Sequence, residues 1–545
     1  MVSNCLKNPD RLHCDVMKFF IIFIIFIIST EPVLARKKVR PSLRESPSIQ
    51  TKEEGIQTIF HSLDPFSVSQ HLAFYQLYPD TVEGKKALQT AWHLLGGSSD
   101  SPQLAVANLP AIEIHGIIDL VNRPSFEVAG HLTEEQLILI DTLGKNLAHK
   151  NLKGHFVSSA QEALALQDEE TDLARTLLLF QLDKDPERDR KIKQYEAELD
   201  LMALQIRSRL KDSCTHEDKI REINRFIFLE MQFRFPPKSL YAADIDVYTF
   251  LPSVLDGRQG VCLGVSILYL SLAQRLDLPL EVITPPGHIY VRYNNGKKII
   301  NIETTARGID TPSEVYLGVN TRLLTKRSLK EVVGLAFMNE AAVCWGQGVY
   351  EKALTLYEKA ILFMPEDPKL KMFFGFVHLF NGKKEVGIAL LKEVCKASPF
   401  YDEVSPETIP EDYLQGRIDV EGIKAVFLPV DETRESILIK QKELQKLLER
   451  YPRYRAGLLQ LATTFLQLGR TKEAKEVLDR YHKLDSSNVI VEYYLTILSL
   501  ERLDYIQSWH HFTLLSKLLQ KRDHSPLLLM SLRQQLISVC PMPPQ

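Results

Sequence analysis

Cysteine is scarce in this sequence, and no two cysteines have the short spacing of a zinc site. Seven of the 545 residues are cysteine, and there is no CxxC pair. Because structural zinc sites commonly use such pairs, we expect neither a metal site nor another cofactor. Five cysteines remain if a leader ending at residue 35 is removed, and since five is odd, at least one thiol stays free or pairs outside the chain. The five are Cys214, Cys262, Cys344, Cys395 and Cys540.

The sequence also lacks a large charge of one sign. Its 66 basic and 69 acidic residues leave a net charge of −3. General nucleic-acid binders carry an excess of positive charge, so we do not expect nucleic acid as a partner. Hydrophobic residues make up 45% and charged residues 25% of the chain, as in ordinary globular proteins. The length predicts several domains.

No hydrophobic run is long enough to suggest a membrane-spanning helix, which needs about 20 apolar residues. The apolar block Phe19–Ile28 follows one lysine and precedes a polar stretch that ends in Val33-Leu34-Ala35. This order is typical of a secretory signal, with small residues before the cleavage site. We therefore predict a signal peptide over residues 1–35, with translation starting at Met17, and export to the periplasm or beyond the cell. After cleavage no stable span is expected; the alternative is an uncleaved N-terminal anchor.

Residues 36–54 are polar and basic and are interpreted as a linker, and residues 55–182 have the periodicity of helices. Within them, "HLTEEQLILIDTL" places Thr133 three residues before Gln136, which predicts a capping box at the start of a helix. No catalytic motif occurs there, and we interpret this region as scaffold. The histidines His115, His510 and His511 are likewise interpreted as structural.

The C-terminal part of the chain repeats. Gly348, Ala353, Tyr357, Ala360 and Pro365 are followed 34 residues later by equivalent positions, with a glycine in place of the alanine, and the spacing recurs from Gly469. This is the period of tetratricopeptide repeats, in which each unit is a pair of antiparallel helices. We predict such an array over residues 328–545, interrupted by an insert at 401–433. Its concave groove is a candidate docking surface for a protein partner.

One cysteine has an unusual setting. In "RQGVCLGVSILYLSLAQRLDLPL", Cys262 precedes a run that is apolar on every face, which predicts a buried central helix. The first turn of a helix favours a thiolate through its unpaired N–H groups and its dipole. Gly260 and Gly264 would leave room for a substrate near the sulfur. The alternative is an inert core cysteine.

The segment after this helix predicts a hairpin that supplies a base and an acid. "PPGHIYVRYNNGKKIINIETT" has an Asn-Gly turn signal between two apolar-alternating runs. If Asn295-Gly296 form a two-residue turn, Glu303 lies directly opposite His288, within about 5.5 Å between Cβ atoms. A turn one residue earlier would place Asn301 there instead, and a three-residue loop would place neither.

Four further polar residues lie on this face or near the cysteine in the two-residue register. Asn301 would face Tyr290 on the side of His288, and Arg292 lies on that side as well. Tyr290 and Asn301 are therefore candidate supporting residues, together with Gln259, which precedes the cysteine helix.

At these residues the sequence resembles the transglutaminase-like superfamily, which has a papain-like fold, and in particular its bacterial branch with C-terminal tetratricopeptide repeats. The resemblance covers about residues 183–310 and the repeat tail, and we predict the transglutaminase-like domain over residues 183–327. It implies a multidomain chain: a helical N-terminal region, an α+β transglutaminase-like domain and an all-α repeat solenoid. It also implies that Cys262 is the nucleophile, His288 the base and Glu303 the acid. Two departures are that Glu replaces the usual Asp and that no Trp follows His288.

The resemblance implies cysteine-dependent acyl transfer on a protein or peptide substrate. The backbone N–H of Cys262, and speculatively Gln259, would stabilise the oxyanion. Water as acceptor would give a protease or amidase, and an amine would give a cross-link. The rival hypothesis is an inactive transglutaminase-like scaffold whose repeats bind a partner. A third possibility is that the repeats recruit the substrate of an active enzyme.

Overall fold

The computed structural model describes residues 52–96, 114–123, 130–236, 245–431, 433–520, 522 and 524–541. The predicted signal peptide and nearly all of the predicted linker lie outside these residues. Helix α3 begins at Lys52, two residues before the expected end of the linker at residue 54. Among the described residues no helix combines the length and apolar character needed to cross a membrane.

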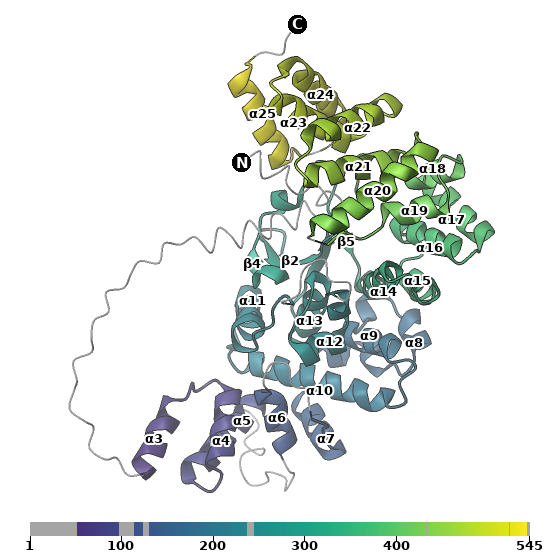
Figure 1. Cartoon of the computed structure of the whole chain (residues 1–545). Coiled ribbons are helices and arrows are strands. Elements are labelled where there is room, and N and C mark those ends of the chain that lie inside the picture. The colour runs from purple at the N-terminus through teal and green to yellow at the C-terminus, as the bar shows by residue number, and fades with distance from the viewer. Residues whose placement is uncertain are drawn as a thin grey trace.

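The N-terminal region is helical, as predicted. Thr133 caps α7 in the expected capping box, because its side chain accepts a hydrogen bond from Gln136 N at 3.2 Å while Gln136 Oε1 accepts one from Thr133 N at 2.9 Å. In Figure 1, α3 to α7 lie beneath the long helix α10, and α8 and α9 lie beside the centre of the molecule. The elements are α3 (Lys52–Ser62), α4 (Val68–Leu77), α5 (Val82–Gly96), α6 (His115–Asn122), α7 (Glu134–Leu143), η3 (Ala148–Asn151), η4 (Lys153–Phe156), α8 (Ala160–Ala165), η5 (Asp168–Glu170) and α9 (Leu173–Gln181).

The central domain is built around helix α13 (Cys262–Arg275). After Cys262, every residue of this helix is buried except Gln274, which confirms the predicted central helix. Helices α9, α10 and α12 and strand β2 all pack against it. The surrounding helices are α10 (Arg188–Arg207), α11 (His216–Asn224), the π-helical continuation η6 (Arg225–Glu230), η7 (Ile245–Thr249) and α12 (Leu251–Gly257).

In the described part of the chain, five strands form one antiparallel sheet in the order β4-β3-β2-β1-β5. The hairpin of β2 and β3 is present, as predicted, and the other strands extend it on both sides. Strand alternation buries Val291 and Ile302 on one face, while Tyr290 lies on the opposite face. The strands are β1 (Glu281–Thr284), β2 (Tyr290–Asn294), β3 (Ile299–Glu303), β4 (Ile309–Asp310) and β5 (Thr325–Arg327), with η8 (Thr304–Ala306) and η9 (Ser313–Tyr316) between them.

The hairpin register differs from every register that the sequence suggested. Asn294 pairs with Ile299, so the connection has four residues, 295–298, rather than two. Asn295 Oδ1 accepts hydrogen bonds from Lys297 N at 3.0 Å and Lys298 N at 2.8 Å, which holds this wider turn. If the pairing of Val291 with Ile302 is continued by one residue, Glu303 lies opposite Tyr290 and not opposite His288. Because the shift is by two residues, Glu303 keeps the face that was predicted for it.

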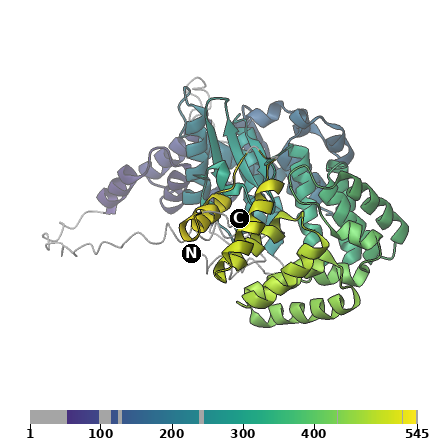
Figure 2. The ribbon, with the colours of Figure 1, turned by 90° about the horizontal axis from the view of Figure 1, so that it is seen from above.

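Helix pairs form the predicted array from Ser328 onward, where Ser328 caps α14. Figure 2 shows the array curving, so that its last helices return beside the sheet domain. Arg522, between α24 and α25, donates to Val319 O at 2.8 Å and Thr321 O at 3.0 Å, which fixes this return. The helices are α14 (Leu329–Gly346), α15 (Tyr350–Phe363), α16 (Pro368–Phe380), α17 (Lys384–Ala397), α18 (Ile409–Leu414), α19 (Val420–Val426), α20 (Arg434–Arg450), α21 (Arg455–Gln467), α22 (Thr471–Leu484), α23 (Val489–Glu501), α24 (Tyr505–Leu518) and α25 (Leu527–Val539).

The turns of the array share one backbone geometry. Gly348, Gly382, Gly416 and Gly469 have φ of +74°, +75°, +69° and +73°. In each turn the backbone N–H of the residue after the glycine donates a hydrogen bond to the carbonyl of the residue five positions earlier. An example is the bond from Arg417 N to Asp412 O at 2.8 Å. Gly416 lies 34 residues after Gly382 and joins α18 to α19. The predicted insert therefore keeps one turn of this kind, but α18 and α19 do not pack against each other as the neighbouring helix pairs do, and the next such turn, at Gly469, follows only after 53 residues. The insert thus interrupts the period, as predicted.

Candidate active site

Cys262 is the first residue of α13 and is half-buried, whereas the remainder of the helix is nearly all buried. The residues before it are fixed by backbone bonds from Gly260 N to Arg234 O at 3.1 Å and from Val261 N to Tyr248 O at 3.3 Å. The N–H groups of a first helical turn have no acceptor within the helix. The thiol thus lies at an electropositive helix end, as the sequence predicted.

His288 lies two residues before β2 and brings the thiol and the acid together. Its Nε2 is 2.7 Å from Glu303 Oε2, and the Cys262 side chain lies near enough to the imidazole to raise its pKa. Since Nε2 is engaged by the carboxylate, Nδ1 is the ring nitrogen left for the sulfur. His288 is therefore paired with Glu303 and lies near Cys262, although the hairpin register from which this proximity was predicted was wrong.

The two inner groups are charged. His288 and Glu303 are only 8% and 1% exposed. Burial lowers the pKa of His288, but the Glu303 carboxylate and the Cys262 side chain outweigh it and raise that pKa to about 10. Burial raises the pKa of Glu303, but the imidazole and the hydrogen bonds to Thr305 and Tyr316 outweigh it and hold that pKa below its usual value. The pair is thus an imidazolium and a carboxylate at neutral pH.

Tyr316 is a residue of this site that sequence reasoning missed. Its hydroxyl donates to Glu303 Oε2 at 2.7 Å. Its ring stacks on His288, with centroids 5.9 Å apart and planes 16° apart, and on Tyr290 at 4.4 Å and 18°. The stack fixes the plane of the imidazole. Tyr316 ends η9, a short helix outside the hairpin, and no local motif marked it.

The predicted supporting residues have other partners. Arg292 donates to Asn301 Oδ1 at 2.8 Å and to Tyr290 Oη at 2.7 Å. Asn301 Nδ2 donates to Thr311 O at 2.7 Å. These three side chains lie on the face of His288, as predicted, but brace the sheet beside the site. Asn301 does not replace Glu303 as the partner of the imidazole.

The glycines near the sulfur do not provide space for a substrate. A Cβ on Gly264 would lie 2.1 Å from Tyr248 O, and one on Gly260 would lie 2.6 Å from Val265 Cγ2. The chain itself therefore fills the room that the sequence suggested for a ligand. Gln259 is buried, and its backbone forms a parallel bridge with Arg234. These contacts make the segment a rigid support for the start of α13.

All five cysteines of the described chain are free thiols. Cys344 and Cys395 lie in α14 and α17, within repeat helices, as expected. Burial raises the pKa of both thiols. The labelling rates of Cys344 and Cys395 therefore serve as internal references for the reactivity of Cys262.

Comparison with known proteins gives one family and several distant relatives. The family profile of the transglutaminase-like superfamily matches residues 193–333, close to the predicted 183–327. A UPF0162 protein of Xylella fastidiosa strain Temecula1 is 21% identical over 278 residues, covering 47% of this chain and 92% of that protein. A second one, from strain 9a5c, is 26% identical over 245 residues, covering 41% of this chain and 83% of that protein.

Solved structures that resemble the chain contain tetratricopeptide repeats. A thermophilic TPR protein of Thermus thermophilus has 18% identity and a TM-score of 0.19, covering 38% of this chain and 100% of that chain. The TPR domain of P58(IPK) has 9% identity and a TM-score of 0.19, covering 87% and 94%. These scores are low, so the repeats rest on the chain's own helix pairs and turns. Residues 193–333 thus form a transglutaminase-like superfamily domain, and a tetratricopeptide-type array of helix pairs follows it.

Proposed function

We propose that this protein is a cysteine-dependent acyl-transfer enzyme that acts on a protein or peptide. One observation supports this above all: the His288 imidazole lies between the Glu303 carboxylate and the Cys262 thiol, at the N-terminus of a buried helix. A nucleophile, a base and a group that orients the base are the parts that nucleophilic catalysis needs. Cys262 is half-buried, while His288 and Glu303 are buried.

The charge of the pair defines the starting state. Because the pKa of His288 is raised to about 10, the imidazole holds a proton at neutral pH. The proton that Cys262 must lose before it attacks is then held by His288, and the imidazolium stabilises the thiolate that forms. Glu303 stabilises this state and fixes the ring, so that Nδ1 faces the sulfur.

Acyl transfer then takes two steps. The thiolate forms a bond to the amide carbonyl carbon, and the backbone N–H of Cys262 stabilises the oxyanion. When the C–N bond breaks, the imidazolium proton goes to the leaving amine, which leaves a thioester on Cys262. His288, now neutral, takes a proton from water or an amine as that molecule attacks the thioester. Water yields hydrolysis and an amine yields a cross-link.

The repeat array would present the substrate to the site or dock a partner. Its return contact through Arg522 keeps its last helices near the sheet domain. The array also shares one apolar core with the domain, and Lys359 of α15 donates to Phe180 O at 3.0 Å. Removing the array after Arg327 would expose that core. Point substitutions in the array, rather than truncation, are the suitable test of recruitment.

Iodoacetamide labelling at pH 6, read by mass spectrometry of each cysteine peptide, tests the proposal. We expect Cys262 to be labelled at least about 100-fold faster than Cys344 or Cys395, because thiolates are the reactive form. His288→Ala should remove this preference. His510→Ala, which changes an exposed histidine, is the matched control and should not. Slow, uniform labelling of all thiols would reject the enzyme and favour a binding scaffold.

A further inference from the structure

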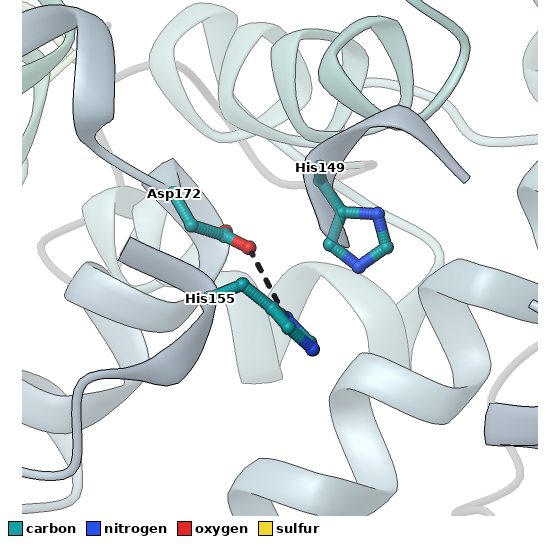
Figure 3. Close-up of side chains that lie close together, drawn as sticks. All are labelled: His149, His155 and Asp172. Carbon is teal, nitrogen blue, oxygen red and sulfur yellow. Dashed lines mark ion pairs between the residues drawn. The ribbon is translucent and has the colours of Figure 1, made fainter. Parts of the chain in front are cut away.

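A second cluster of chemically active side chains lies far from the thiol. His149 on η3, His155 on η4 and Asp172, the N-cap of α9, come together as Figure 3 shows. One possible ligand atom from each residue lies within 4.8 Å of the others. His155 Nδ1 is 4.0 Å from Asp172 Oδ2, the contact drawn in the figure. The cluster therefore joins two short helices to the start of a third.

The cluster holds buried polar atoms without hydrogen-bond partners. They are Nδ1 of His149, Nδ1 of His155 and Oδ2 of Asp172, and His149 Nε2, which lies 3.3 Å from Asp200 Oδ1, also makes no hydrogen bond. His149 is 1% exposed and Asp172 is 0% exposed. Each unpaired buried polar atom costs about 1–3 kcal/mol, so such atoms rarely gather without a reason. An ion that these atoms bind would remove this cost.

The two imidazoles are in the protonation state that metal ligands need. Burial lowers the pKa of His149 far below its usual value, and burial with nearby cations lowers that of His155 to about 4. Both rings are thus neutral at neutral pH, and each has a lone pair to share. Asp172 Oδ1 caps Arg175 N at 3.1 Å, which leaves Oδ2 directed at the histidines.

The charged groups around the cluster are paired with one another. Three cations lie close: Lys150, Arg175 and Arg275. Arg275 Nε is 2.8 Å and Lys150 Nζ 3.3 Å from Asp200, which also lies 3.3 Å from His149 Nε2. The guanidinium of Arg175 is 3.0 Å from the carboxylate of Glu196. Lys150 also pairs with Asp141. Each of the three cations therefore contacts a carboxylate other than that of Asp172, which leaves the charge of Asp172 for an added cation.

From this geometry we propose that His149, His155 and Asp172 bind one divalent transition-metal ion, with zinc the best match. Two imidazoles and a carboxylate are zinc ligands, and water would complete a tetrahedron. Bonds of about 2.0–2.1 Å place tetrahedral ligands about 3.3 Å apart. The present separation of 4.0 Å between His155 and Asp172 requires a modest closure. His155 is the most exposed of the three side chains and would supply that movement.

The position of the cluster gives the ion a structural role. Gln274, near the C-terminal end of α13, accepts from Leu173 N at 3.1 Å and donates to Thr171 O at 2.8 Å, on either side of Asp172. Cys262 lies twelve residues earlier on that helix, or about 18 Å along its axis. The ion would fasten η3 and η4 to α9 at the end of α13 remote from the sulfur, without contact with the reacting atoms.

A similar trio in the repeats provides the comparison. Among the described residues the other metal-compatible cluster is His482, Glu492 and His511. There the carboxylate of Glu492 already bonds both rings, at 2.5 Å to His482 Nδ1 and 2.8 Å to His511 Nδ1. Its polar atoms have partners without an ion, so it is a matched negative control.

Zinc binding to the full chain tests the proposal. The protein is treated with EDTA, desalted and dialysed against micromolar zinc chloride, and bound metal is measured by mass spectrometry. We expect one equivalent of zinc and a rise in Tm. Cobalt in its place should give the visible absorption of a tetrahedral site.

Three variants separate a specific site from incidental binding. His155→Gln and Asp172→Asn, the second of which keeps a capping side chain, should each weaken zinc binding at least about 100-fold, more than loss of a ligand's outer partner costs. His482→Gln should bind zinc as the unchanged protein does. The proposal is overturned if the unchanged protein binds no zinc, if both cluster variants bind it normally, or if His482→Gln alone loses it.

Discussion

The hydroxyl of Tyr316 donates to Glu303 Oε2 at 2.7 Å, and the same oxygen lies 2.7 Å from His288 Nε2. One carboxylate oxygen thus receives two donors, and the donor ring also stacks on the imidazole. Tyr316, which lies outside the hairpin, thereby stabilises the charged pair of Glu303 and His288 and fixes the plane of the imidazole.

Removal of the Tyr316 hydroxyl should destabilise the site while leaving its other side chains in place. Tyr316→Phe keeps the stacked ring but deprives a buried carboxylate of one donor. Hydrogen bonds to charged groups contribute about 1.5–3 kcal/mol, so we expect the free energy of unfolding to fall by about 2 kcal/mol, measured by calorimetry. Tyr290→Phe, which removes a hydroxyl bonded to Arg292 and not to Glu303, should leave the rate of Cys262 labelling unchanged. Equal labelling and equal stability in Tyr316→Phe would contradict its role.

Glu303 should control the pH at which Cys262 reacts. Glu303→Gln removes the charge that raises the pKa of His288, so the imidazole releases its proton at lower pH. Each unit by which that pKa falls reduces the proton affinity tenfold, and we expect Cys262 labelling at pH 6 to slow at least about tenfold. Glu281→Gln, on strand β1 of the same sheet, is the control and should label normally. An unchanged pH profile in Glu303→Gln would count against the triad.

The ion pair should contribute stability over a defined pH range. The pKa of His288 rises from 6.5 to about 10 on folding, so its contribution is complete below pH 6.5 and is lost as the pH rises through about 10. The pKa of Glu303 falls, so its contribution is present above 4.5 and is lost as the pH falls through its folded value.

The difference in Tm between the unchanged protein and His288→Ala should therefore be greatest near pH 5–6.5 and shrink toward pH 10. At about 1.4 kcal/mol for each pKa unit, the change is on the order of 5 kcal/mol. Melting curves across this range, with His510→Ala as reference, measure it. A difference that grows between pH 7 and 10 would refute the charge assignment.

The last turn of the array should be strained. Leu503 stands 34 residues after Gly469, and its φ is +60°, where the four other turns of the described array have glycine. A left-handed conformation costs a residue with a side chain about 1–2 kcal/mol, and the Leu503 side chain is 70% exposed. Leu503→Gly should raise stability by about 1 kcal/mol, and Gly469→Ala should lower it by a similar amount. Calorimetric melting of both variants would contradict this if Leu503→Gly were the less stable one.

The sequence predicted the elements that local chemistry specifies. The run that is apolar on every face predicted a buried helix that begins at Cys262, and the Asn-Gly turn signal predicted a hairpin. Side chains alternate along a strand, so residues an even number apart share a face whatever the loop length. Glu303 therefore reached the side of His288 even though the connection has four residues instead of two.

The repeat period was equally local, because each turn needs a residue that tolerates positive φ. The insert retains one such turn, at Gly416, but its short helices α18 and α19 do not form a packed pair, so it interrupts the period as the sequence predicted. The histidines of the N-terminal region have no spacing that predicts a metal site. The expectation that the chain has no metal site was based on the spacing of the cysteines alone.

What the sequence by itself determined is the identity of the helix, the hairpin and the repeats, since their patterns depend on neighbours a few residues apart. The tertiary structure alone decided the exact register, the choice of Tyr316 as the partner of Glu303, and the meeting of His149, His155 and Asp172. Those contacts join segments from separate elements. Their geometry follows from how whole helices and strands pack, which no short stretch of sequence encodes.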